Sequence, residues 1–217
     1  MLLPSIILVD DHHMFRGSLK SLITNEKIGT IAGEASNGKE FLEILENNVP
    51  DLVLMDIDMP IMDGAEATRI AVEKHPQIKI LALSMFGEEN YYYKMVKAGV
   101  KGFLLKTSDI KELEIAIREV VSGESYFSNE LLRNIITNFG KKTIAQNEIN
   151  ELVKLTERER DVIELVCKGS TNEEIAEKLH ISPKTVKGHR ANLLAKTDCK
   201  NTPSLVIYAI KNKIIEI

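Results

Sequence analysis

The chain has 217 residues, of which 44% are hydrophobic and 28% charged, and its net charge is -4. This composition can bury one large core or two small ones, and it excludes disordered and fibrous proteins. No apolar run approaches the roughly 20 residues of a membrane span, and the first residues lack a basic leader, so we expect a cytoplasmic protein with no membrane partner.

Short apolar runs alternate with helical patterns through the first half of the chain. The expected strands are Ser5 to Val9, Thr30 to Ala35, Asp51 to Met55, Lys79 to Leu83 and Gly102 to Leu105. After the fifth strand, apolar residues recur at helical spacing between a capping Asp109 and a terminating Gly123. This alternation predicts an α/β fold with a five-stranded parallel sheet.

Chemically active residues follow four of these strands. They are Asp10 and Asp11 after the first, Asp56 after the third, Ser84 after the fourth and Lys106 after the fifth. In open α/β sheets, ligands bind outside the carboxyl ends of the strands. The sequence therefore predicts that three carboxylates, a hydroxyl and an amine meet in one site.

Carboxylates held together require a cation, and Mg²⁺ is suited to oxygen ligands and to phosphate chemistry. One carboxylate of such a site can attack phosphorus and form an acyl phosphate. A lysine and a hydroxyl would stabilise the transferred group. These residue types therefore point to phosphoryl transfer onto the protein.

Four motifs resemble the receiver domain of two-component response regulators, which has a flavodoxin-like (βα)5 fold. They are Val9-Asp10-Asp11-His12, Met55-Asp56-Ile57-Asp58-Met59-Pro60-Ile61-Met62-Asp63-Gly64, Ala82-Leu83-Ser84 and Lys97-Ala98-Gly99-Val100-Lys101-Gly102-Phe103-Leu104-Leu105-Lys106. The resemblance implies a sensor histidine kinase as phosphoryl donor and Asp56 as phospho-acceptor, with Lys106 pairing the phosphoryl group. It also implies Mg²⁺ on Asp10, Asp11, Asp56 and the backbone carbonyl of Asp58. Ser84 and Phe103 would be the switch residues.

Two segments are less informative. Tyr91-Tyr92-Tyr93 falls in the expected fourth helix, where either simple packing or a partner-facing surface fits. Residues 124–150 are irregular and polar with one helical piece, Leu131 to Phe139, which is typical of a linker. We therefore expect a receiver at 1–123, a linker at 124–150 and a second domain at 151–217.

The last part of the chain shows only helical signals. Thr156 to Glu159 and Thr171 to Glu174 are capping boxes, and Ser182-Pro183 begins a further helix. Residues 1–147 carry a net charge of -5 and residues 148–217 a charge of +1, and from residue 181 onward seven basic residues face two acidic ones. Two short helices, a tight turn and a basic second helix predict a small all-α helix-turn-helix domain.

Residues 152–217 resemble the LuxR-type DNA-binding domain of the NarL/FixJ subfamily. The matching segments include Leu155-Thr156-Glu157-Arg158-Glu159 and Ser182-Pro183-Lys184-Thr185-Val186-Lys187-Gly188-His189. By this resemblance, the residues that face double-stranded DNA are Lys184, Thr185, Lys187, His189 and Arg190. Those that pair two subunits on activation are Leu205, Val206 and Ala209.

We expect a DNA-binding transcription regulator that phosphorylation controls, not an enzyme with its own substrate. Two alternatives remain. Asp56-Ile57-Asp58 has the Asp-x-Asp form of haloacid dehalogenase-type phosphatases, although that group places the motif on its first strand. An RNA-binding output domain is the second, against which the helix-turn-helix spacing argues.

Overall fold

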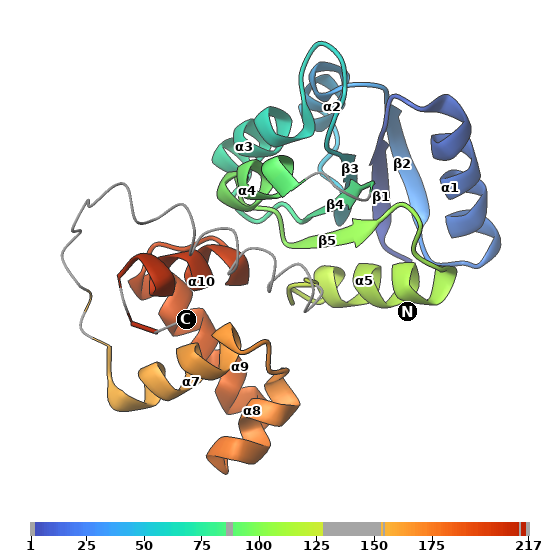
Figure 1. Ribbon diagram of the computed structural model, residues 1–217. Coiled ribbons are helices and arrows are strands. Elements are labelled where there is room, and N and C mark those ends of the chain that lie inside the picture. Colours follow the sequence, from blue (N-terminus) through green and yellow to red (C-terminus); the bar gives the residue numbers. More distant parts are fainter. Residues whose placement is uncertain (1–2, 86–88, 128–152, 154, 213, 216–217) are drawn as a thin grey trace. The chain divides into compact units, whose positions relative to one another are not determined.

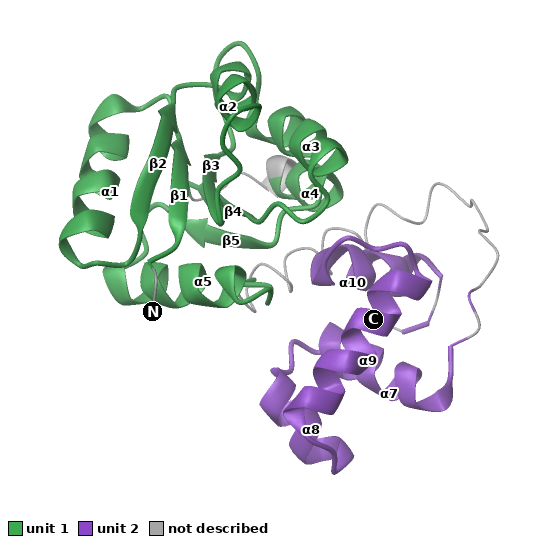
Figure 2. Cartoon of the chain, turned by 180° about the vertical axis from the view of Figure 1, so that it is seen from behind, with its two compact units in different colours: residues 1–127 green, residues 128–217 purple. Residues whose placement is uncertain are grey.

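The structure is a computed structural model that describes residues 3–85, 89–127, 153, 155–212 and 214–215. The chain divides into two compact units, residues 1–127 and 128–217, which Figure 2 colours green and purple. The linker helix expected at Leu131 to Phe139 lies outside the described residues. None of the described helices is long and apolar enough to cross a membrane.

The first unit contains a five-stranded sheet in the order β2-β1-β3-β4-β5, with every neighbouring pair parallel (Figure 1). Its strands are β1 Ser5–Val9, β2 Thr30–Ala35, β3 Leu52–Asp56, β4 Ile80–Ser84 and β5 Gly102–Leu105. The predicted α/β fold is confirmed, because each strand returns through a crossover helix as parallel pairing requires. The Asp56-Ile57-Asp58 motif leaves the third strand rather than the first, which is not the position that the phosphatase alternative needs.

Two strands begin and end one residue later than the sequence predicted. β3 and β4 each include the polar residue expected just beyond them, because Asp56 pairs with Leu83 and Ser84 pairs with Leu105 in the ladder. Both side chains are therefore carried on paired backbone. Asp10 follows β1 but is also held, since its N–H donates to the carbonyl of Ala35.

Helices cover both faces of the sheet. They are α1 His13–Asn25, α2 Gly38–Leu45, α3 Gly64–Lys74, α4 Glu89–Ala98 and α5 Ile110–Val121. α1 and α5 share one face, where Ile6, Leu8, Leu19 and Ile117 belong to a single buried cluster, and α2, α3 and α4 cover the other (Figure 1). Successive strand residues point to opposite faces, so the buried apolar residues Ile6 to Val9 of β1 supply both cores. The expected cap is confirmed, because the Asp109 side chain accepts from the N–H of Glu112.

The second unit is all-helical. Its described helices are α7 Glu157–Cys167, α8 Asn172–Leu179, α9 Pro183–Lys196 and α10 Thr202–Lys211. Both predicted capping boxes are present, with Thr156 and Thr171 as N-caps, and Ser182 caps α9 before Pro183. The turn between α8 and α9 contains His180 in the left-handed conformation. The helix-turn-helix arrangement is therefore fixed by local signals at each helix end.

Candidate functional site

Acidic side chains gather at the carboxyl edge of the sheet. One ligand atom from each of Asp10, Asp11, His12 and Asp56 lies within 4.8 Å of the others. Asp10 and Asp56 are buried, whereas Asp11 is partly exposed. The convergence predicted from the strand ends is thus present in the fold.

Lys106 joins two of these carboxylates. Its Nζ lies 2.7 Å from Asp56 Oδ2 and 2.9 Å from Asp10 Oδ2, and its side chain is only 7% exposed. The N–H of Lys106 donates to the carbonyl of Ser84 at 2.8 Å, so the chain after β5 is tied to the end of β4. The Lys106 ammonium also lies 5.0 Å from the centre of the Phe15 ring, a cation–π contact from α1. Sequence reasoning missed Phe15, which carries no chemical signal of its own.

The charges of this cluster are not balanced. Burial raises the pKa of Asp56 to about 6; the hydrogen bond from Lys106 opposes this rise, and the negative charge of Asp10 adds to it. Burial would lower the pKa of Lys106, but its bonds to Asp10 and Asp56 outweigh that effect and raise it. Carboxylate oxygens crowded in this way are a suitable donor set for a small divalent cation, since Mg²⁺ prefers oxygen ligands.

The loop after Asp56 is held by close backbone contacts. The N–H of Gly64 donates to the carbonyl of Ile57 at 2.9 Å, and a Cβ on Gly64 would lie 2.0 Å from the carbonyl oxygen of Asp56. Only glycine therefore fits at this position. Asp58, in the same loop, has an exposed side chain, which leaves its backbone carbonyl as the atom that the resemblance assigns to a metal.

The two expected switch residues, Ser84 and Phe103, both contact Tyr92. Ser84 Oγ lies 2.8 Å from the carbonyl of Met85 and 3.3 Å from the hydroxyl of Tyr92 on α4. The rings of Tyr92 and Phe103 pack edge to face with centroids 5.2 Å apart, and Phe103 is buried. Two interpretations of Tyr91-Tyr92-Tyr93 were open, packing and a partner-facing surface. Tyr92 packs within the unit, where it contacts both expected switch residues.

The residues of α9 that are expected to face DNA fall into two groups. Lys184, Thr185 and Lys187 are exposed, and His189 is partly buried. Arg190 instead joins three helices, since its Nη1 donates to Asn172 Oδ1 at 2.7 Å and its Nη2 to Thr202 Oγ1 at 2.8 Å. The expected DNA-facing set thus shares one helix, but Arg190 is engaged inside the domain.

The residues expected to pair two subunits lie in the core of the second unit. Leu205, Val206 and Ala209 are 1%, 0% and 0% exposed and belong to the apolar core that α10 builds with α7, α8 and α9. The sequence shows an amphipathic helix but not which partner covers its apolar face. In this structure the face covers the domain's own core, and a role for these three residues in pairing subunits stays a prediction.

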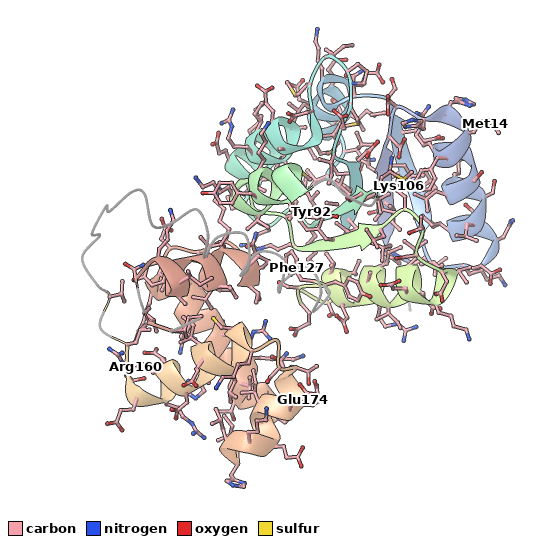
Figure 3. All side chains as sticks on the ribbon, in the orientation of Figure 1. Met14, Tyr92, Lys106, Phe127, Arg160 and Glu174 are labelled. Atoms are coloured by element: carbon pink, nitrogen blue, oxygen red, sulfur yellow. The ribbon has the colours of Figure 1, made fainter. Side chains whose placement is uncertain are left out.

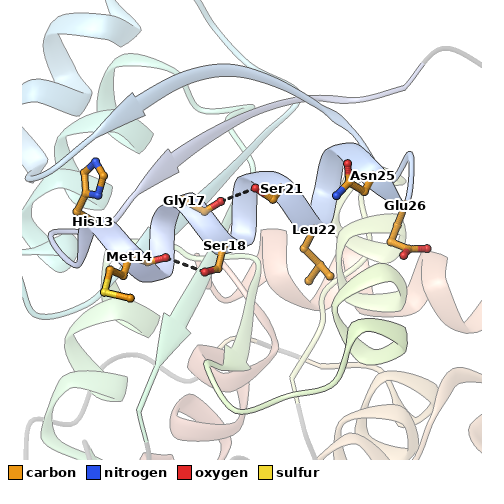
Figure 4. Close-up of a pocket in the computed structure, with 8 residues that line it drawn as sticks. All are labelled: His13, Met14, Gly17, Ser18, Ser21, Leu22, Asn25 and Glu26. Atoms are coloured by element: carbon orange, nitrogen blue, oxygen red, sulfur yellow. Dashed lines mark hydrogen bonds between the residues drawn. The ribbon is translucent and has the colours of Figure 1, made fainter.

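A shallow pocket lies along the outer side of α1 (Figure 4). None of the residues of the carboxylate cluster lines it. Its lining includes Met14, Gly17, Ser18 and Ser21. The hydroxyls of Ser18 and Ser21 donate to the carbonyls of Met14 and Gly17 at 2.8 and 3.0 Å. Both serine hydroxyls are used within the helix, and the carboxylate cluster remains the candidate reaction site.

Comparison with known proteins places both units. Residues 6–118 match the model of the response regulator receiver domain, and residues 153–209 match that of bacterial regulatory proteins of the luxR family. The response regulator protein VraR of Staphylococcus aureus is 37% identical over 97% of this chain and 98% of its own length.

Two solved structures show related folds. A LuxR-family two-component response regulator from Aurantimonas sp. is 29% identical, with a TM-score of 0.58 over 63% of this chain and 97% of that one. A structure of two RcsB dimers bound to two parallel DNAs is 16% identical, with a TM-score of 0.56 over 98% of this chain and 99% of that one. The second likeness concerns the fold alone.

Proposed function

The chain belongs to the response regulators that combine a receiver domain with a LuxR-type DNA-binding domain, and we propose that Asp56 accepts its phosphoryl group from a sensor histidine kinase. The chain is a DNA-binding transcription regulator under receiver control rather than an enzyme with its own substrate. The proposal assigns a receiver to residues 1–123, a linker to 124–150 and a DNA-binding domain to 151–217.

One observation carries the proposal: Lys106 Nζ lies within 3 Å of both Asp56 and Asp10 at the carboxyl edge of the sheet. An Asp56 carboxylate oxygen would form a bond to phosphorus while the bond from phosphorus to the donor histidine nitrogen breaks. The Lys106 ammonium would neutralise charge on the transferred group, and the Ser84 hydroxyl would donate to one of its oxygens. Burial keeps both interactions away from competing water.

The same cluster fits Mg²⁺. Asp10, Asp11, Asp56 and the backbone carbonyl of Asp58 would hold it, because they offer only oxygen donors and carry excess negative charge. When bound, the ion supplies charge neutralisation for the carboxylates and the phosphoryl oxygens. Arg16 supports this edge, since its Nη1 donates to the carbonyl of Asp10.

The output would be double-stranded DNA. Lys184, Thr185 and Lys187 are exposed on α9 beside His189, where phosphate and base-edge contacts from one helix in the major groove are possible. We assign Arg190 to fixing the helices rather than to DNA. RcsB was captured on DNA as dimers, and a homodimer is proposed here as well, because two half-sites double the contacts of one small module. DNA as target and a kinase as donor favour the cytoplasm.

Labelling of the full chain by radioactive acetyl phosphate with Mg²⁺ tests the proposal. The unaltered protein should be labelled and Asp56→Asn should not, because an amide is not a nucleophile towards phosphorus. Glu73→Gln is the matched control: Glu73 is exposed in the last turn of α3, which runs away from the carboxyl edge of the sheet. Undiminished labelling of Asp56→Asn would overturn the assignment.

A further inference from the structure

Tyr92 contacts both residues that the receiver switch requires. Its hydroxyl oxygen lies 3.3 Å from Ser84 Oγ, and its ring packs edge to face on Phe103 with an interplanar angle of 87°. Tyr92 comes from α4, whereas Ser84 and Phe103 come from β4 and β5. The Tyr92 side chain, from a third element, therefore contacts both switch residues.

The Ser84 hydroxyl is satisfied where it stands. Besides Tyr92, it has the Met85 carbonyl at 2.8 Å, and a hydroxyl has a single proton to donate. Ser84 is the donor in both contacts, so if its Oγ turns to donate to a phosphoryl oxygen on Asp56, it leaves the Met85 carbonyl and the Tyr92 hydroxyl together. The contact with Tyr92 therefore favours the unphosphorylated position of Ser84.

Phe103 continues the contact towards the end of the first unit. Its ring lies 6.1 Å from that of Phe127, the last residue of the first unit, and its N–H donates to the carbonyl of Tyr126 at 2.8 Å. The N–H of Tyr126 donates to the carbonyl of Lys101 at 3.0 Å, so the segment pairs with the free edge of β5. Gly102 permits this approach, because a Cβ there would lie 2.7 Å from the Tyr126 carbonyl oxygen. Figure 3 labels Tyr92 and Phe127.

We propose that Tyr92 is a positioning residue that holds Ser84 in its unphosphorylated position, and that its packing on Phe103 passes the release of Ser84 to Phe127, at the end of the first unit. The proposal rests on Asp56 being the phospho-acceptor. It adds Tyr92 as the residue that opposes movement of Ser84, and Phe127 as the residue whose surroundings change when Ser84 moves. Repacking of Phe103 is the physical link, since close-packed rings move together rather than independently.

A double-mutant cycle on the full chain tests the first part. Tyr92→Phe removes only the hydroxyl, so phosphorylation by acetyl phosphate with Mg²⁺ should become about 2- to 10-fold faster, the range expected for one lost hydrogen bond. In a Ser84→Ala background, the same substitution should leave the rate unchanged, because the partner is already absent. Tyr93→Phe is the matched control from the next position, where the ring lies under Lys97 Nζ at 4.7 Å.

An equal effect of Tyr92→Phe in both backgrounds, or no effect in either, would overturn the positioning role. This result is distinct from failure of the proposed function, in which the unaltered chain itself would not be labelled on Asp56.

Fluorine NMR of the full chain with 4-fluorophenylalanine tests the second part. The Phe127 signal, assigned by its loss in Phe127→Leu, should shift when beryllofluoride and Mg²⁺ occupy the Asp56 site. The shift should disappear in Phe103→Leu, which removes the ring between Tyr92 and Phe127. A Phe127 signal that stays in place while other signals move, or one that still shifts in Phe103→Leu, would overturn the path to the linker.

Discussion

The two units place their cationic side chains in opposite ways. In the first, Lys106 is 7% exposed and lies between two buried carboxylates, so the sheet edge fixes its position. In the second, Lys184 and Lys187 are exposed on α9, while Arg190 is tied to neighbouring helices. Transfer chemistry needs charges that are held and desolvated, whereas DNA reading needs charges that can reach a phosphate backbone. On α9 the exposed lysines are thus distinct from Arg190, which joins the helices.

The largest expected loss of stability follows from placing a charge in the core of the second unit. Leu205→Glu puts a carboxylate among the apolar side chains of a core cluster, whereas the carboxylates of the first unit lie beside Lys106. We expect a loss of about 4 kcal/mol or more, which unfolds the second unit. Urea unfolding followed by circular dichroism measures this loss in the free energy of unfolding.

Lys211→Glu, a substitution at an exposed position of the same helix, is the control. A stably folded Leu205→Glu chain that fails only to dimerise would restore the interface role.

Substitutions of Arg190 and Lys187 distinguish a residue that holds the helices together from one that is expected to bind DNA. Arg190→Ala removes two charge-assisted hydrogen bonds that join α8, α9 and α10, so unfolding of the second unit should cost about 2 to 3 kcal/mol less. Lys187→Ala should change stability by less than about 0.5 kcal/mol but weaken DNA binding, and it should lower the salt slope by about 1 if the contact is to phosphate. Unfolding and salt-dependent binding on a selected duplex check both. Equal stability losses in the two variants would contradict the division.

How far the sequence predicts each region depends on what specifies it. Asp10, Asp56, Ser84 and Lys106 converge as expected, because parallel strands bring their carboxyl ends to one edge whatever the loops do. The role of Arg190 was not predictable in the same way, since its partners Asn172 and Thr202 are remote in sequence and polar residues of ordinary type. The apolar face of α10 was visible, but periodicity does not say whether a core or a second chain covers it. The hydroxyl of Tyr92 was likewise indistinguishable from those of its two neighbours.

Two buried carboxylates should respond to pH with opposite signs. Hydrogen bonds from Lys196, at 2.7 and 2.8 Å, and from Thr156 hold the pKa of Glu159 below its usual value. The charged form therefore stabilises the second unit above about pH 4.5, and this contribution is lost as the pH falls through the lower folded-state pKa. Glu159→Gln should cost about 1 to 2 kcal/mol at pH 7 and nothing well below pH 4.

Asp56 is the contrasting case, because its pKa is raised to about 6 in the metal-free protein. Its protonated form is favoured on folding, so stability falls as the pH rises from about 4 to about 6. Asp56→Asn should therefore stabilise the metal-free chain above pH 6 and lose that advantage near pH 4. Unfolding at several pH values with a chelator present measures both variants. Curves that run parallel to the unaltered protein would show that neither carboxylate titrates as its surroundings require.

A further modest effect on stability is expected in the loop after Asp56, where the backbone is strained at Ile61. Ile61 has a φ of 71°, and the N–H of Met62 donates to the carbonyl of Pro60 across it, a tight turn that a β-branched residue adopts at a cost. Its side chain is 80% exposed, so little packing offsets that cost. Ile61→Gly should stabilise the first unit by about 1 kcal/mol, because glycine tolerates positive φ. Ile61→Ala keeps the Cβ and should not stabilise. Urea unfolding with hydrogen exchange on residues 5–127 separates them, and equal gains would trace the effect to side-chain exposure instead of strain.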